Sequence, residues 1–221
     1  PLPPTTEDDR VAWLRLLRSR RVGVATFWRL MSEHGDAQTA LTALPEVARA
    51  AGVEEYQTCP EGVVHAEMKA ARRAGARLIC RGEPAYPAPL ARIEDAPPAL
   101  WVIGDPAALT RPSVAVVGAR NASSLGLRMA RDLSAGLSRA GFVVVSGLAL
   151  GIDAAAHRAA LQGGTVGVLA GGVDVLYPED NADLAREMTG TGVRISEQPM
   201  GLKPMARHFP ARNRLISGLA Q

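Results

Sequence analysis

The sequence predicts an α/β protein with a doubly wound, mainly parallel sheet, preceded by a small all-helical domain. Three observations predict this fold. Apolar residues recur at helical spacing through the first 75 residues, a stretch crowded with proline follows, and the rest of the chain repeats strand, glycine loop and helix. Such alternation is typical of a parallel sheet with crossover helices. We expect the domains to span 1–75, 76–112 and 113–221.

The helical domain is predicted from apolar side chains three and four residues apart. Helices are expected between Asp8 and Gly52, and a further helix spans Val64–Ala74 and ends at Gly75. The apolar positions of the first region are Val11, Leu14, Leu17, Phe27, Leu30, Met31, Leu41, Leu44, Val47 and Ala48.

A short basic turn, residues 20–25, separates the first two of these helices. Helix, tight glycine turn and helix is the layout of helix-hairpin-helix modules, which hold DNA phosphates on backbone amides. The turn contains Gly23 but no second hairpin glycine. We therefore prefer a small helical packing domain to a DNA-binding hairpin at these residues.

Residues 76–112 are predicted to form an extended connector that leads into the sheet. Prolines interrupt it at Tyr86–Pro89 and Ala96–Pro98. Two short apolar strands are expected within it, at Arg77–Cys80 and Ala99–Ile103.

The doubly wound sheet is predicted within residues 113–221. Its strands are expected at Val114–Val117, Phe142–Val145, Val166–Leu169 and Val193–Ser196, and its helices at Leu125–Ala140 and Asp153–Leu161. The ligand of such a sheet lies at the carboxyl ends of the strands.

The positive charge of the chain is concentrated near its carboxyl-terminal end. The 221 residues carry a net charge of +3, and between Gln198 and Gln221 there are four cations and no acid. The whole positive excess therefore lies in this segment. Its cations are Lys203, Arg207, Arg212 and Arg214. Arginine suits planar, bidentate recognition of phosphates and bases.

Composition excludes several classes of protein. With 47% hydrophobic and 21% charged residues, the chain is neither collagen-like nor wholly disordered. Cys59 and Cys80 form no zinc pattern and no disulfide framework, which favours a reducing cytoplasm. No stretch approaches the roughly 18 apolar residues of a membrane span, and no signal peptide is recognisable. We expect a cytoplasmic protein with no membrane partner, metal or cofactor.

The first candidate loop, residues 118–126, joins a predicted strand directly to a helix. Gly118 lets the backbone approach a ligand, Ser123 or Ser124 can cap the helix, and Arg120 adds a positive charge. The loop has no GxGxxG pattern and no acid follows about 20 residues later, so an NAD site is disfavoured. We prefer a phosphate contact to a purely structural turn.

Ser146 and Gly147 open the second loop, which leads into a helix that carries Asp153 and His157 four residues apart. The pair suits a metal site or an acid/base dyad, but no further ligand accompanies it. We prefer the interpretation that Asp153 caps the helix and His157 hydrogen-bonds to Asp153. Ser146 does not lie in a GxSxG motif, so a hydrolase nucleophile is not indicated.

The third loop, residues 170–181, has paired glycines after a strand, but its acids Asp174, Glu179 and Asp180 would repel a phosphate. We predict a structural turn in which Asn181 caps the next helix.

The fourth candidate segment, Phe209–Arg214, is predicted to be a loop within the acid-free tail. Phe209 offers a stacking platform, and Asn213 offers a donor and an acceptor to a base edge. Arg212 and Arg214 add phosphate contacts. This combination suits single-stranded nucleic acid.

Together these motifs resemble the DNA-processing protein A family, DprA/Smf. The match runs from about residue 75 to the end, and the helical start is similar to the sterile-alpha-motif-like domain of the family. The matching motifs are VAVVGAR at 114–120, VSGLALGIDAAAH at 145–157, LYPEDN at 176–181, ISE at 195–197 and FPARNRLISGL at 209–219, preceded by AYP at 85–87 and PPAL at 97–100.

The resemblance implies an extended Rossmann domain without catalytic activity that binds single-stranded DNA. It also implies protection of incoming DNA, loading of RecA recombinase during natural transformation, and a homodimer in the full-length protein. By motif, the implied DNA-binding residues are Gly118, Arg120, Ser146, Gly147, Phe209, Arg212, Asn213 and Arg214, and we add Lys203 and His208 on charge alone. Family members continue through further strands and often a winged-helix domain, so we expect this chain to be part of a longer protein.

An alternative is a nucleotide-binding enzyme or sensor of the Rossmann phosphoribohydrolase, lysine-decarboxylase-like type. Those proteins carry a PGGxGTxxE-type motif, whereas the comparable stretch here, residues 170–174, lacks the Gly-Thr pair and the glutamate. Release of the base from a nucleoside monophosphate would distinguish this enzyme from a DNA-binding protein. A purely structural role is the third option.

Overall fold

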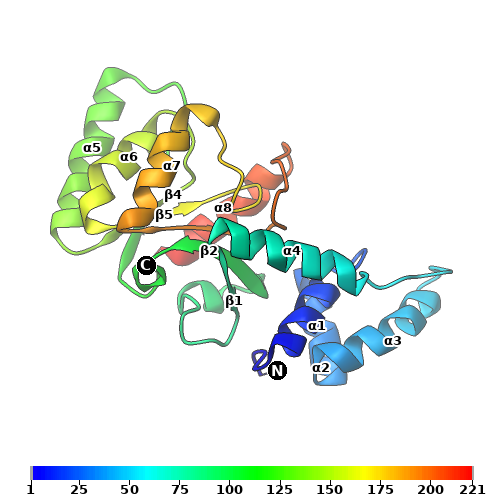
Figure 1. The fold of residues 1–221 in the computed structure, drawn as a ribbon. Coiled ribbons are helices and arrows are strands. Elements are labelled where there is room, and N and C mark those ends of the chain that lie inside the picture. The colour runs from blue at the N-terminus through cyan, green and yellow to red at the C-terminus, as the bar shows by residue number, and fades with distance from the viewer. Residues whose placement is uncertain (1, 221) are drawn as a thin grey trace.

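The computed structural model describes residues 2–220 and shows a helical part beside an α/β part (Figure 1). The helices of the first part are α1 (Glu7–Arg18), α2 (Val24–His34), α3 (Ala37–Ala50) and α4 (Glu61–Ala74). A capping box begins α1, because Thr6 accepts from the backbone of Asp9 while the Asp9 carboxylate accepts from the backbone of Thr6. Across residues 2–220, no helix has both the length and the apolar character that a membrane span needs.

Three aromatic rings hold the first two helices together and fasten them to the connector. Trp13 in α1 contacts Phe27 and Trp28 in α2 edge-on, with ring centroids 5.0 and 5.9 Å apart. The indole N–H groups of Trp13 and Trp28 donate to the carbonyl oxygens of Pro98 and Ala96 at 3.1 and 3.2 Å. The helices on both sides of the basic turn thus pack against the proline-rich segment.

A buried ion pair of the helical part is hydrogen-bonded to the sheet through Trp101. The guanidinium of Arg18 lies 2.8 Å from a carboxylate oxygen of Glu67, and the indole N–H of Trp101 donates to the same oxygen at 2.7 Å. Burial alone would raise the pKa of Glu67, but the hydrogen bonds from Arg18 and Trp101 and the charge of Arg18 hold it below its usual value.

The α/β part is built on one six-stranded sheet in the order β1-β2-β6-β5-β4-β3. Its strands are β1 (Arg77–Cys80), β2 (Ala99–Gly104), β3 (Ser113–Ala115), β4 (Val143–Ser146), β5 (Thr165–Val168) and β6 (Val193–Ser196). The pairs β3–β4, β4–β5 and β5–β6 are parallel, whereas the connector strands β1 and β2 add antiparallel pairs beside β6. The predicted α/β class with a mainly parallel sheet is confirmed.

Helices cover both faces of this sheet. They are α5 (Ser124–Arg139), α6 (Ile152–Ala160), α7 (Ala182–Glu187) and α8 (His208–Leu219). The side chains of Val143 and Val145 pack in a cluster with Leu215 of α8, while Val144 between them packs with Ala156 of α6. Figure 1 shows α5, α6 and α7 together on one face and α8 on the other.

One predicted loop is a helix. Residues 209–214 form the first turns of α8 rather than a loop. Pro210 and Gly218 disfavour a helical interpretation of the sequence, but a proline in the first turn lacks only an N–H that has no partner within the helix. The Phe209 and Asn213 side chains therefore project from a rigid element.

Candidate nucleic-acid interface

The predicted site residues gather at the carboxyl ends of β3 and β4. The loops that follow these strands, 116–123 and 147–151, meet the amino-terminal half of α8 there. Ser123 caps α5 as predicted, because its hydroxyl accepts from the backbone N–H of Gly126 at 3.1 Å. The edge of the sheet at which a doubly wound protein holds its ligand is thus the edge where the motifs converge.

Asp153 ties the first two loops to each other. Its carboxylate accepts from the backbone N–H groups of Gly118 at 3.4 Å and Gly147 at 3.0 Å. The interpretation that Asp153 caps α6 is wrong, since Gly151 holds the cap position and no side chain caps this helix. Because the Asp153 carboxylate accepts from one amide of each loop, it fixes the two loops relative to each other.

Glycine is required where these loops touch. Gly151 has a φ of +78°, and a side-chain carbon there would lie 2.3 Å from the carbonyl oxygen of Ala119. Gly118 packs against Ile152, to which an added carbon would approach within 2.7 Å. The backbone of residues 118–120 therefore rests directly on the start of α6.

Arg212 lies beneath the site rather than on its surface. Its guanidinium donates to the carbonyl oxygens of Gly147, at 2.8 Å, and Val168, so it joins the ends of β4 and β5 to α8. Burial lowers its pKa, an effect that the charge of Asp153 opposes. A carbon added at Gly147 would lie 2.6 Å from the Arg212 guanidinium carbon, so the hydrogen-bonded guanidinium would have to shift.

The ring of Phe209 stands over this buried arginine and reaches the surface. The Arg120 guanidinium carbon lies 5.4 Å from the ring centroid, and the Tyr177 ring lies 5.9 Å away at an angle of 54°. Arg120, Tyr177 and Asn213 are exposed, and Phe209 is partly buried. An aromatic ring is thus held between a second ring and a cation with its free area toward solvent.

A cavity of about 550 Å³ adjoins this ring and forms the groove of the site. Residues from all three segments line it, among them Gly118, Arg120, Ala149, Asp153, Phe209, Arg212 and Asn213. The volume suits a nucleotide-sized group.

The other predicted residues occupy different places. Arg214 is paired within the protein, 2.6 Å from Glu197 and 2.9 Å from Asp95, and His208 is buried and accepts from the backbone of Met205 at 3.1 Å. Lys203 is exposed on the segment before α8, and Ser146 is buried. The structure thus brings Gly118, Arg120, Ser146, Gly147, Phe209, Arg212 and Asn213 together and directs Arg214 elsewhere.

His157 does not contact Asp153. Its Nδ1 lies 2.7 Å from the hydroxyl of Thr165, which donates to the carbonyl oxygen of Val144. The hydroxyl has one proton, so Nδ1 of His157 carries the hydrogen of their mutual bond. Complete burial lowers the pKa of His157 to about 3, so the ring is neutral at physiological pH. The predicted hydrogen bond between His157 and Asp153 is wrong.

The third loop is a packed turn. Gly171 and Gly172 are buried, and added carbons would lie 2.5 Å from the Leu202 carbonyl oxygen and 2.7 Å from that of Pro199. Asn181 occupies the cap position of α7, but its side chain caps nothing and instead donates to the carbonyl oxygens of Leu148 and Ala149. The predicted side-chain cap is therefore wrong.

Two contributors to the site were missed by sequence reasoning. Tyr177 was interpreted as part of a structural turn and Asp153 as a helix cap, yet Tyr177 extends the aromatic surface and Asp153 joins two loops. Their signal was position, because each follows the carboxyl end of a strand in the parallel sheet.

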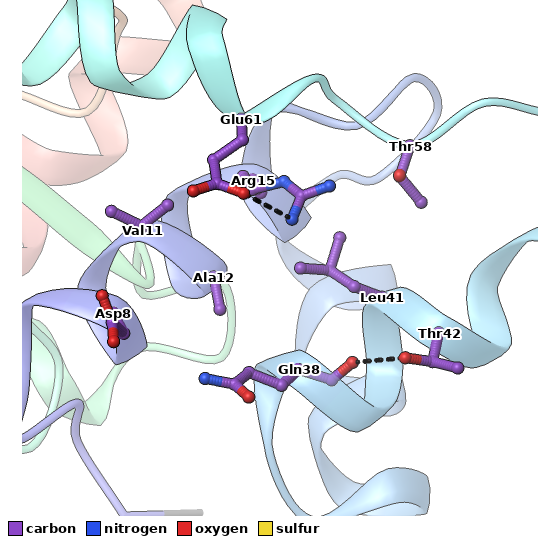
Figure 2. Close-up of a pocket in the computed structure, with 9 residues that line it drawn as sticks. All are labelled: Asp8, Val11, Ala12, Arg15, Gln38, Leu41, Thr42, Thr58 and Glu61. Carbon is purple, nitrogen blue, oxygen red and sulfur yellow. Dashed lines mark hydrogen bonds and ion pairs between the residues drawn. The ribbon is translucent and has the colours of Figure 1, made fainter.

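A second cavity, of about 500 Å³, lies in the helical part (Figure 2). Its wall carries the acids Asp8 and Glu61, and Arg15 points at Glu61, with 3.8 Å between the charged atoms. Arg15 also donates to the carbonyl oxygen of Cys59 at 3.0 Å. Among residues 2–220, no three or more His, Cys, Asp or Glu side chains are grouped so that they could hold a metal ion.

Comparison with known proteins adds a family to this geometry. The model of the family described as "DNA recombination-mediator protein A" matches residues 77–221, which contain all the loops of the site. The chain belongs to this family. A second model, described as "DprA-like N-terminal HHH domain", matches residues 7–70 and supports the helix-hairpin-helix layout for the helical part.

Curated relatives carry the names DprA and Smf. The chain is 39% identical over 157 residues to the DNA processing protein DprA of Bacillus subtilis, which covers 70% of this chain and 53% of the relative. It is 34% identical over 226 residues to protein Smf of Escherichia coli, covering 96% of this chain and 58% of that one. The chain thus spans about half the length of the curated relatives it matches.

Solved DprA structures share the fold. DNA processing protein A from Streptococcus pneumoniae superposes with a TM-score of 0.75 at 30% identity, over 95% of this chain and 75% of that one. The protein from Helicobacter pylori, whose structure addresses a single-stranded DNA binding mode, gives a TM-score of 0.61 at 29% identity, over 66% of each chain.

Proposed function

We propose that this chain binds single-stranded DNA in the groove at the carboxyl ends of β3 and β4 and performs no chemistry on it. The observation that carries the proposal is the ring of Phe209, held between Tyr177 and Arg120 beside a cavity of about 550 Å³. Aromatic rings beside cations are the means by which proteins hold unpaired bases and their phosphates. The single-stranded DNA binding addressed for the relative from Helicobacter pylori supports the same ligand.

The site residues divide into those that touch DNA and those that position them. Phe209 and Tyr177 stack on bases, Arg120 neutralises a phosphate, and Asn213 hydrogen-bonds to a base edge. The backbone of Gly118 allows close approach of the strand, and Lys203 adds a peripheral phosphate contact.

The remaining predicted residues act as supports. Arg212 ties α8 to the ends of β4 and β5, and Gly147 leaves room for it. Ser146 is the buried last residue of β4. His208 fixes the start of α8 through the backbone of Met205, and Arg214 fixes its outer side through Glu197. These positioning roles replace direct DNA contacts for the five residues.

An enzyme of the phosphoribohydrolase type is disfavoured. Its glycine pair would have to receive a phosphate after β5, but Gly171 and Gly172 are buried against the segment 199–204. Incubation of the protein with nucleoside monophosphates should release no free base.

At the level of the whole protein, we propose a cytoplasmic recombination mediator. The family description supports a role in mediating recombination, and delivery of the bound strand to RecA follows from the resemblance. Protection of incoming DNA and dimerisation of the full-length protein follow from the resemblance. A nuclease-protection assay and a strand-exchange assay on the full-length protein would test the first two activities.

The DNA-binding proposal is tested by fluorescence anisotropy with labelled single-stranded and duplex oligonucleotides over a range of salt. We expect the single strand to bind more tightly than the duplex. The logarithm of its binding constant should fall with the logarithm of the salt concentration, with a slope of about −0.7 per phosphate neutralised. Phe209→Ala should weaken binding by about 1–3 kcal/mol. The matched control is Phe142→Ala, which removes an exposed phenylalanine next to the amino end of β4. Unchanged affinity in both Phe209→Ala and Arg120→Ala would contradict the site.

A further inference from the structure

Three arginines line a cavity next to the groove, and one of them, Arg120, lines both. The cavity has a volume of about 490 Å³ and lies between α5 and α6. Arg131 from the second turn of α5 and Arg158 from α6 line it together with Arg120. We call these three residues and the space between them the arginine pocket.

The arginine pocket adjoins the groove. Arg120 lines both cavities, and it also lines a small cavity of about 60 Å³ between them. Leu150 is shared by the small cavity and the arginine pocket, while Phe209 is shared by the small cavity and the groove. A strand stacked on Phe209 therefore lies next to Arg120, which also lines the pocket of Arg131 and Arg158.

The guanidinium groups of the arginine pocket are free to bind an anion. Among residues 2–220, no ion pair includes Arg120, Arg131 or Arg158, and all three are exposed. Asp180 is the acid in the lining, so three positive charges face one negative charge. The guanidinium groups of Arg212 and Arg214 are not free in this way, because Arg212 donates to the Gly147 carbonyl oxygen and Arg214 pairs with Glu197.

The walls of the pocket explain how it stays open. On α6, Ala154 and Ala155 line it with single methyl groups, and Gly151 adds no side chain at all. Both helices are held by close packing against each other, so Arg131 and Arg158 project from fixed backbones. The planar guanidinium suits bidentate contacts with phosphate oxygens.

We propose that the arginine pocket binds backbone phosphates of the same single strand whose bases stack on Phe209. This inference rests on the proposed function and extends it, because it assigns Arg131 and Arg158 as further DNA-binding residues. It places the path of the strand from α8 across Arg120 to the cleft between α5 and α6. The shared chemistry is a phosphate ester, which a DNA strand or a free nucleotide could supply, and we commit to the strand.

The test is the double variant Arg131→Ala/Arg158→Ala, measured by anisotropy with oligonucleotides of about 4 and about 16 nucleotides. For the longer strand we expect the salt slope to become shallower by about 0.7 for each lost phosphate contact, and the affinity at 0.1 M salt to fall about tenfold. For the shorter strand, which is held at Phe209, the affinity should stay within about twofold of the unsubstituted protein.

The matched control is Arg128→Ala/Arg139→Ala, which removes two exposed arginines of α5 that do not line the pocket. This control lowers the net charge by the same amount. Any difference in affinity between the two double variants therefore depends on where the arginines lie. A loss that is equal in the two double variants, or equal for both strand lengths, would overturn the arginine pocket while leaving the groove in place.

Two further outcomes are distinct. If the unsubstituted protein binds neither oligonucleotide, the proposed function itself fails. If calorimetry shows that a nucleoside monophosphate binds the unsubstituted protein but not Arg131→Ala/Arg158→Ala, while both bind the longer strand equally, the pocket serves a free nucleotide and the proposed strand path is overturned.

Discussion

The cavity of the helical part and the groove at the strand ends are similar in size, about 500 and 550 Å³, but their arginines and acids have different partners. In the helical cavity, Arg15 faces Glu61 and a backbone carbonyl, and Asp8 adds another acid (Figure 2). In the groove, the acid Asp153 is occupied by two backbone amides, which leaves Arg120 free beside Phe209. The size of a cavity therefore does not indicate which ligand it binds. The partners of the acids decide which cavity can hold an anionic strand.

The comparison is tested most strongly by Trp13→Ala in the helical part. Trp13 is buried against Phe27 and Trp28, so its loss should lower the free energy of unfolding by about 3–5 kcal/mol. Because the groove is built from other elements, the protein that remains folded should bind single-stranded DNA with unchanged affinity. Urea denaturation measures the first effect, and anisotropy at low temperature measures the second. Loss of binding in fully folded protein would contradict the division of roles.

The counterpart in the groove is Gly147→Ala. The added carbon would lie 2.6 Å from the guanidinium carbon of Arg212, so Arg212 must move and the support beneath Phe209 is lost. We expect destabilisation of about 1–3 kcal/mol and weaker DNA binding. Gly136→Ala is the matched control, since nothing lies within 4 Å of the position and alanine favours the interior of a helix. Equal effects of the two substitutions on binding would show that Arg212 does not position the ring.

A smaller effect is expected from pH. Burial holds the pKa of His157 at about 3, below its usual value of 6.5, so the unfolded chain takes up the proton first. Stability is therefore complete above pH 6.5 and falls as the pH drops from 6.5 toward 3, by about 1 kcal/mol per pH unit. Chemical denaturation from pH 8 to pH 4 measures this slope. His157→Gln should flatten this slope, and a slope that persists in His157→Gln would assign it to other groups.

The smallest effect is expected at the basic turn between α1 and α2. Arg20→Ala/Arg21→Ala removes two exposed charges from the helical part, where we expect the hairpin to pack rather than to bind DNA. Because exposed charges remote from a bound strand are screened by salt, the affinity for single-stranded DNA should change by less than about twofold. A loss comparable to that of Arg120→Ala would place DNA on the helical part as well.

Local patterns predicted most of the sheet. The valine run of β4 and the glycine loops after the strands are visible in the sequence, and the observed strands lie within two residues of the predicted ones. The sequence pattern did not predict α8, because Pro210 and Gly218 disfavour a helix there. The apolar side of α8 packs on strands from earlier in the chain, and this contact is not visible in the local sequence.

The sequence indicated most of the residues that the structure brings together at the strand ends, but it did not indicate Tyr177 or the partners of each arginine. The charge of Arg212 and Arg214 is visible in the sequence, but their partners Val168, Glu197 and Asp95 are 17 to 119 positions away. Only the fold shows that these arginines are occupied within the protein and that Arg120 is free. Long-range hydrogen bonds decide whether a cation is a support or a ligand contact.

The most direct test of the account is photocrosslinking of the full chain to single-stranded DNA that carries 5-iodouracil, with the crosslinked peptides mapped by mass spectrometry. Crosslinking by this base favours aromatic side chains that stack on it. We predict crosslinks at Phe209 and Tyr177, and their loss in Phe209→Ala/Tyr177→Ala. Crosslinks confined to the helical part, at Trp13, Phe27, Trp28 or Tyr56, would contradict the assignment of DNA to the groove.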